Sequence, residues 1–208
     1  MNILAIGAHF DDVEIGCAGA LAKHRSLGDN VLIQVITHSK YNDYSGELIR
    51  TKETAYKEGL EASKVLDCNL ICNHYETKQV MFNYKLIEDI NRVIDDNNID
   101  MIYTHWDFDI HQDHQAIGKA TMAAGRHVNK ILMYQSNLYP NSIPFNSNYF
   151  VDITDFINLK KEAIMCHKSE VDKFGPDWIP FWINEAKSNG RKVGVGFAEA
   201  FQMVKYFV

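Results

Sequence analysis

A chain of 208 residues, with 46% hydrophobic and 23% charged side chains, is long enough for one α/β domain with its own core. Its net charge of −6 and the lack of a block rich in lysine and arginine argue against nucleic acid or an anionic membrane surface as a partner. The longest apolar runs have the length of strands, so we expect no membrane span, and without an export signal we expect a cytoplasmic protein.

The first half of the chain alternates short apolar runs with stretches of helical periodicity. Such repeated strand–helix–strand units predict a mostly parallel sheet with helices on both faces. The expected strands are residues 2–8, 31–37, 69–72 and 100–104, and the helices between them are residues 13–27, 47–66 and 84–97.

A further helix and strand, residues 111–129 and 131–134, extend the same pattern. After Tyr139 the alternation changes. We expect a strand at 149–153, helices at 154–167 and 177–188, and a closing segment at 196–208. This last third is interpreted as a C-terminal cap over the sheet edge. The predicted fold class is therefore α/β and Rossmann-like, in a single domain over residues 1–208.

A cluster of charged side chains directly follows the first apolar run. His9, Asp11, Asp12 and Glu14 fall on the expected turn from the first strand to the first helix. Open α/β sheets bind ligands at this edge, beyond the carboxyl ends of their strands. Neighbouring carboxylates repel one another unless a cation offsets their charge. The cluster therefore predicts a metal ion.

A second cluster, with His111, Asp113 and His114, follows the fourth strand. Parallel strands end at the same edge, so we expect the two clusters to meet. Capping explains one acid per helix start, but not both clusters together. Imidazoles and carboxylates suit zinc or a similar divalent metal, with iron(II) as an alternative. Three such ligands leave room for a water whose pKa falls to about 7, and a free carboxylate can take its proton. This chemistry is metal-assisted hydrolysis of an amide or ester.

The two clusters resemble the paired motifs of the PIG-L/LmbE-like N-acetylglucosaminyl deacetylase family. The family pattern His-Pro-Asp-Asp-x-Glu corresponds to residues 9–14, and His-x-Asp-His corresponds to residues 111–114. Weaker similarities lie at 46–53, 167–169 and 197–201. Phe10 and Gln112 replace prolines common in the family, and Phe10 is expected to reshape the turn and narrow the pocket.

The resemblance implies a role for each motif residue. His9, Asp12 and His114 would be the metal ligands, and Asp11 would be the general base that activates the attacking water. From the residues alone, which of the two aspartates binds the metal stays open. His111 would stabilise the oxyanion as an imidazolium.

The resemblance also implies supporting and substrate-binding groups. Asp113 would orient a histidine. Arg50 would hydrogen-bond a sugar hydroxyl or phosphate, Glu14 would support the turn and the substrate side, and His167 would lie near the substrate. Alternatively, Arg50 is a solvated helix cation and His167 caps a helix. Three aromatic residues are expected mainly to pack the cap, although they could stack on a sugar: Trp178, Phe181 and Trp182.

The expected activity is that of a zinc-dependent N-deacetylase acting on an N-acetylated amino sugar of the N-acetylglucosamine type, with release of acetate. The alternatives are a hydrolase of another N-acyl amide or of a phosphate ester, and a non-catalytic sugar-binding relative. A nucleotide-binding Rossmann module is disfavoured, because the turn lacks Gly-x-Gly-x-x-Gly and its acids would repel a pyrophosphate. The partner would be a small-molecule sugar, and the aglycone and any homo-oligomer stay open.

Overall fold

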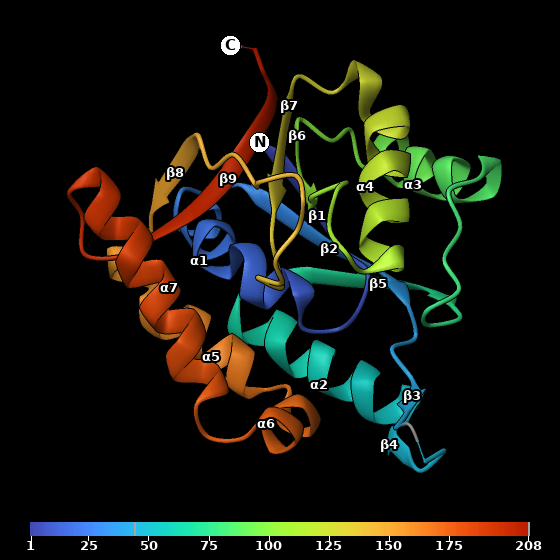
Figure 1. Ribbon diagram of the computed structural model, residues 1–208. Coiled ribbons are helices and arrows are strands. Elements are labelled where there is room, and N and C mark those ends of the chain that lie inside the picture. Colours follow the sequence, from blue (N-terminus) through green and yellow to red (C-terminus); the bar gives the residue numbers. More distant parts are fainter. Residues whose placement is uncertain (44, 208) are drawn as a thin grey trace.

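The computed structural model describes residues 1–43 and 45–207, and its centre is a seven-stranded sheet (Figure 1). The strands are β1 (Asn2–Gly7), β2 (Asn30–Thr37), β5 (Asn69–Tyr75), β6 (Met101–His105), β7 (Lys130–Tyr134), β8 (Tyr149–Asp152) and β9 (Ala198–Tyr206). Their spatial order is β5-β2-β1-β6-β7-β9-β8. The first five in this order are parallel, and β9 is antiparallel to both of its neighbours. The predicted mostly parallel sheet is therefore confirmed.

Helices cover both faces of the sheet, as expected (Figure 1). On one side lie α1 (Asp12–Ser26), α2 (Lys52–Val65), α5 (Ile157–Met165) and α7 (Trp178–Val193), and on the other lie α3 (Tyr84–Asp96) and α4 (Gln112–Ala124). Side chains along β1 alternate between the two cores, because successive strand residues point to opposite faces. Ile3 and Ala5 pack on the α1 side, whereas Leu4 and Ile6 pack on the α3–α4 side.

Helix α1 lies unusually close to its neighbours because it presents glycine at two contacts. A Cβ on Gly16 would lie 2.1 Å from the ring of Tyr134, and one on Gly19 would lie 2.7 Å from Ile153. This close approach fixes the height of α1 above the sheet. It therefore also fixes the first turn of α1, which carries Asp12.

A buried ion pair also holds α1. Lys160 Nζ lies 2.6 Å from a carboxylate oxygen of Glu199, and both side chains are almost fully buried. The ammonium donates to the carbonyls of Glu14 and Ile15, while the carboxylate accepts from the N–H groups of residues 19 and 20. In a regular helix the Ile15 carbonyl accepts from the N–H of residue 19. The pair therefore joins α5 and β9 to the backbone of α1.

Three expected boundaries differ from the structure. The helix expected from residue 47 begins at Lys52, where Thr51 accepts the N–H of Thr54, and a hairpin of β3 (Tyr41–Asn42) and β4 (Leu48–Arg50) precedes it. The helix expected at 154–167 is divided into a 3-10 turn and α5, and α6 (Lys168–Phe174) follows.

The closing segment gives the third difference. Its strand β9 enters the sheet between β7 and β8, so the last third extends the sheet as well as capping it. Pairing covers the edge of β7 that would otherwise expose unpaired backbone groups.

Within the described ranges, none of the helices combines the length and apolar character that crossing a bilayer requires.

Candidate active site

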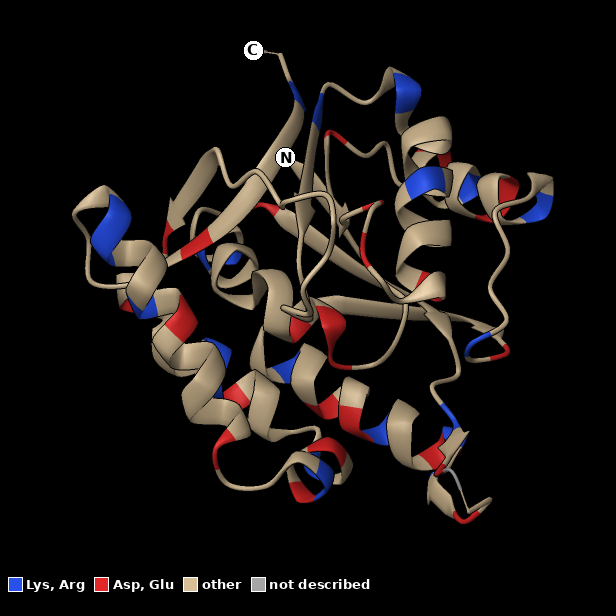
Figure 2. Ribbon diagram, viewed as in Figure 1, with Lys and Arg blue, Asp and Glu red and all other residues tan. Residues whose placement is uncertain are grey.

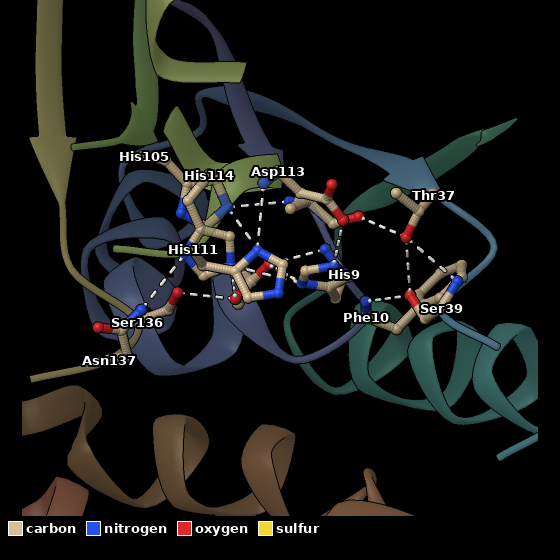
Figure 3. Close-up of polar contacts among 12 residues, drawn as sticks. His9, Phe10, Thr37, Ser39, His105, His111, Asp113, His114, Ser136 and Asn137 are labelled. Atoms are coloured by element: carbon tan, nitrogen blue, oxygen red, sulfur yellow. Dashed lines mark hydrogen bonds and ion pairs between the residues drawn. The ribbon is translucent and has the colours of Figure 1, made fainter. Parts of the chain in front are cut away.

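Three loops that leave the same edge of the sheet form the candidate site, after β1, β6 and β7 (Figures 1 and 3). Acidic residues mark the start of α1 at this edge (Figure 2). Four imidazoles come together there: the ring of His114 lies 4.0 Å from that of His105 and 4.6 Å from that of His111, and His9 lies 4.8 Å from His111. The prediction that the two clusters meet is therefore confirmed.

His9, Asp12 and His114 present three donor atoms to one point. His9 Nδ1 lies 3.3 Å from Asp12 Oδ2 and 3.4 Å from His114 Nε2, and His114 Nε2 lies 3.4 Å from Asp12 Oδ1. Two ligands at about 2.0–2.1 Å from a tetrahedral zinc ion are roughly 3.3 Å apart. The donor types and their spacing therefore fit a zinc-like ion, and these residues form a candidate metal site.

Each candidate histidine ligand has a carboxylate on its other ring nitrogen. His9 Nε2 lies 3.0 Å from Asp113, and His114 Nδ1 lies 3.2 Å from Asp109. Such carboxylates fix the ring orientation and tautomer of histidines that bind metals. His9, His111 and Asp113 also lie close enough to form a second donor group. Asp113, however, already accepts from His9 and from the backbone of residues 78 and 80, so we favour the first group.

The electrostatics distinguish His9 from Asp12. Burial alone would lower the pKa of His9, but its hydrogen bonds to Asp113 and Asp12 raise that pKa to about 10. Burial alone would raise the pKa of Asp12, but the neighbouring His114 and His105 outweigh it and hold the pKa well below its usual value. Asp12 is therefore ionised at neutral pH, and a metal ion would have to displace a proton from His9.

Asp11 differs from Asp12 in both conformation and charge. Its φ of 129° is unusual for any residue but glycine, and such strain is typical of functional sites. Burial, followed by the charges of Glu170 and Asp12, holds the pKa of Asp11 well above its usual value. Asp11 also lines a cavity of about 240 Å³ that includes the three candidate ligands. Adjacent carboxylates with opposite pKa shifts suit a metal ligand and a proton carrier.

His111 is the N-cap residue of α4, and its Nδ1 accepts the backbone N–H of Asp113 at 3.2 Å. In a neutral imidazole the proton is then on Nε2, which can donate to a ligand. Burial, together with the charges of His9 and His114, lowers the pKa of His111 to about 4. This lowered pKa favours a neutral ring over the imidazolium form expected from the sequence.

Arg50 is buried and surrounded by protein groups. It donates to the carbonyl of Phe10 at 2.9 Å and to the carboxylates of Glu58 and Glu170 at 2.9 and 3.2 Å. It lines the cavity but is not a solvated helix cation. Its bond to Phe10 supports the turn between His9 and Asp11.

Glu14 and His167 lie in contact with each other, since His167 Nε2 is 3.3 Å from Glu14 Oε2. Both are buried, and neither lines the cavity of about 240 Å³. His167 Nδ1 also lies 3.3 Å from Arg50. The structure therefore places this pair behind the wall that Arg50 contributes, instead of in contact with a ligand in that cavity.

Phe10 points away from the cavity, contrary to the expectation that it narrows the pocket. Its ring is buried against α2, where a Cβ on Gly59 would lie 2.2 Å from it, and it contacts Tyr56 edge to face. Its N–H donates to Ser39 Oγ at 2.9 Å (Figure 3). A proline has no N–H and could not make this bond.

The loop after β7 also contributes side chains to the site, which was not predicted from the sequence. Ser136 donates to Asp12 at 2.7 Å, and Asn137 donates to Asp109 at 2.8 Å. Both residues of this loop lie beside the histidine cluster (Figure 3). The sequence does contain a pattern that indicates this contribution. These polar residues follow a buried strand next to β6, as the first two clusters follow β1 and β6. His105, the last residue of β6, also contacts the carboxylate of Asp12, with its Nε2 3.2 Å from Asp12. Asp12 is thus held from three strand ends.

Comparisons with known proteins agree with this geometry. The family model of GlcNAc-PI de-N-acetylase (PIG-L) matches residues 4–125, which include both motifs. The uncharacterised deacetylase YaiS of Escherichia coli is 32% identical over 177 residues, covering 81% of this chain and 91% of that protein.

Solved structures with lower identity share the fold. The N,N'-diacetylchitobiose deacetylase of Pyrococcus horikoshii has a TM-score of 0.82 at 22% identity, over 98% of this chain and 84% of that one. The hydratase GalB of Pseudomonas putida also has a TM-score of 0.82, at 16% identity, over 100% and 97%. The fold alone therefore does not identify the reaction. The family match and the curated relative do identify the family: the chain belongs to the PIG-L family of de-N-acetylases.

Proposed function

We propose that this protein is a zinc-dependent hydrolase that removes the acetyl group from an N-acetylated amino sugar and releases acetate. The observation that carries the proposal is the convergence of His9, Asp12 and His114 beside a second carboxylate, Asp11, with a raised pKa. A metal hydrolase requires both a set of ligands and a group that moves a proton.

The residues divide into those that would hold the metal and those that position them. His9, Asp12 and His114 would bind the ion, while Asp113 and Asp109 orient the two imidazoles. A bound divalent cation would polarise the acyl carbonyl and lower the pKa of a coordinated water to about 7.

Two side chains would carry the proton transfers and the charge. Asp11 accepts the proton of the attacking water as the new carbon–oxygen bond forms. It then returns a proton to the amine nitrogen as the carbon–nitrogen bond breaks. His111 donates from Nε2 to the carbonyl oxygen, where negative charge develops. A neutral imidazole is sufficient for this hydrogen bond.

The sugar would occupy the cavity of about 240 Å³ that contains these groups, which we call the polar cavity. Hydroxyl and ammonium groups from separate segments of the chain line it: Ser39, Tyr41, Thr77, Lys78 and Lys173. Arg50 reaches the same wall, whereas Glu14 and His167 would act on the substrate only through Arg50 and the turn that it supports. The Pyrococcus neighbour, named as a diacetylchitobiose deacetylase, supports a substrate of this class.

The proposal is tested by incubating the zinc-loaded protein with N-acetylglucosamine and with N,N'-diacetylchitobiose. Acetate should be released, and the amine product is followed by mass spectrometry. Asp11→Asn should retain zinc but lose about 10²–10⁴-fold in turnover, the usual contribution of a general base. Asp96→Asn, an exposed change at the end of α3, is the matched control.

Near-normal acetate release by Asp11→Asn would contradict the assigned role. Release of phosphate from a sugar phosphate, or hydration of an unsaturated acid without acetate release, would contradict the reaction itself. Binding of the sugars with no turnover by the zinc-loaded protein would point to the sugar-binding alternative.

A further inference from the structure

A second cavity, of about 330 Å³, adjoins the polar cavity. Asp11, Asp12, Asn137, Tyr139 and Phe174 line both, so the two spaces share a wall that includes the candidate catalytic carboxylates. The remainder of the second cavity is mainly apolar, and we call it the aromatic cavity. Its apolar walls include Ile15, Leu138, Phe174, Trp178, Phe181 and Trp182.

The aromatic rings of this cavity form a paired wall at the junction of α6 and α7. Phe174 stacks on Trp178 with ring centroids 5.3 Å apart, and Phe181 meets Trp182 edge to face at 5.1 Å. Trp182 is buried with Ile15 and so packs the cap as expected. Phe174 and Phe181, in contrast, are each 49% exposed. Exposed apolar side chains beside a catalytic site typically mark a place for an apolar part of a ligand.

The two cavities differ in the charged side chains that line them. Hydroxyl and charged groups suit the hydroxyls of a sugar in the polar cavity. In the aromatic cavity, the charged side chains among its lining residues are Asp11 and Asp12, at the shared wall. Hydrocarbon is the ligand chemistry that such a surface favours, because its burial removes apolar area from water.

An amide places its amine substituent and its acyl substituent on opposite sides of the reacting bond. If the proposed function holds and the sugar occupies the polar cavity, the acyl substituent extends toward the aromatic cavity. An acetyl methyl would leave that space largely unfilled. We propose that the aromatic cavity binds the acyl group of the substrate, and that the enzyme therefore accepts N-acyl amino sugars with acyl chains longer than acetyl.

The experiment compares N-acetyl-, N-butanoyl- and N-hexanoylglucosamine as substrates of the zinc-loaded protein. Each methylene buried in the aromatic cavity should raise kcat/KM by up to about fourfold, equivalent to ~0.8 kcal/mol. Phe181→Ala should remove most of this gain, so that its kcat/KM values for the three substrates lie within about twofold of one another. Phe82→Ala, an exposed aromatic residue before α3, is the matched control and should retain the gain.

A second measurement separates this proposal from the proposed function. Hexanoate and acetate are titrated into the zinc-loaded protein, with tryptophan fluorescence as the signal. Hexanoate should bind at least tenfold more tightly than acetate, and Phe181→Ala should abolish the difference, even if no sugar is hydrolysed.

Two outcomes would overturn the proposal. One is equal binding of the two acids together with a preference for the acetyl substrate. The other is a gain that depends on Phe181 with the hexyl glycoside of N-acetylglucosamine but not with N-hexanoylglucosamine, since this would place the amine side in the aromatic cavity.

Discussion

Replacing Glu199 by glutamine tests how the buried ion pair positions the turn that carries the candidate metal ligand Asp12. The glutamine keeps the size of the side chain but leaves the buried ammonium of Lys160 without its carboxylate. Its amide NH₂ would also face a backbone N–H of α1, because both carboxylate oxygens now accept from that helix. Removing one partner of a buried ion pair costs about 3–5 kcal/mol of unfolding free energy. For a chain of this size, that loss would lower Tm by roughly 6–20 °C.

The loss should be non-additive, because each single change leaves an unpaired group. In Lys160→Met/Glu199→Met, no charge stays buried, and the N–H of Gly19 retains the Ile15 carbonyl as a partner within α1. We expect the double variant to recover about 1–3 kcal/mol relative to the sum of the single variants Lys160→Met and Glu199→Met. Urea unfolding of these two single variants, the double variant and the unchanged protein measures this difference.

The exposed change Glu162→Gln on α5 serves as the control and should leave Tm unchanged. The reasoning also predicts weaker zinc binding by Glu199→Gln below its Tm, because α1 carries Asp12. A destabilisation below about 1 kcal/mol, or single effects that simply add, would refute the account of the pair.

Four further predictions follow from contacts in the site or next to it. Asp109→Asn should weaken zinc binding about 10–100-fold by releasing the ring of His114, and unchanged affinity in a competition titration would argue against this role. Gly59→Ala should destabilise the protein by about 1–3 kcal/mol in urea unfolding, because its Cβ would overlap the ring of Phe10, and a neutral effect would show that the ring can move aside. Since the pKa of His9 in the metal-free protein is raised to about 10, zinc affinity should rise by up to about tenfold per pH unit below that value. The same shift stabilises the metal-free fold below pH 6.5, and this stabilisation is lost as the pH rises through about 10, so a metal-free Tm independent of pH would contradict it.

The position of the site could be predicted because it depends on the ends of strands. His9 and Asp12 directly follow β1, and His114 lies in the first turn of α4 after β6. Local sequence is sufficient to place such residues at the carboxyl edge of a parallel sheet. The adjacency of β1 and β6 then brings the clusters together.

The supporting contacts could not be predicted, because they join segments far apart in the chain. The bonds from Ser136 to Asp12 and from Lys160 to Glu199 depend on tertiary packing, which a strand or helix pattern does not specify. The direction of the Phe10 ring depended on a space left by Gly59 on another helix. The hairpin before α2 was missed because helical periodicity continued into residues that pair as short strands.

The different tasks that we propose for Asp11 and Asp12 correspond to different backbone conformations. Asp11 has a φ of 129°, whereas Asp12 is the first residue of α1. Asp12 begins α1 and faces Ser136 and the histidines, whereas Asp11 faces the cavity and the charge of Glu170. In the proposed mechanism the strained residue is thus the one that carries the proton, and backbone strain of this kind is typical of functional sites.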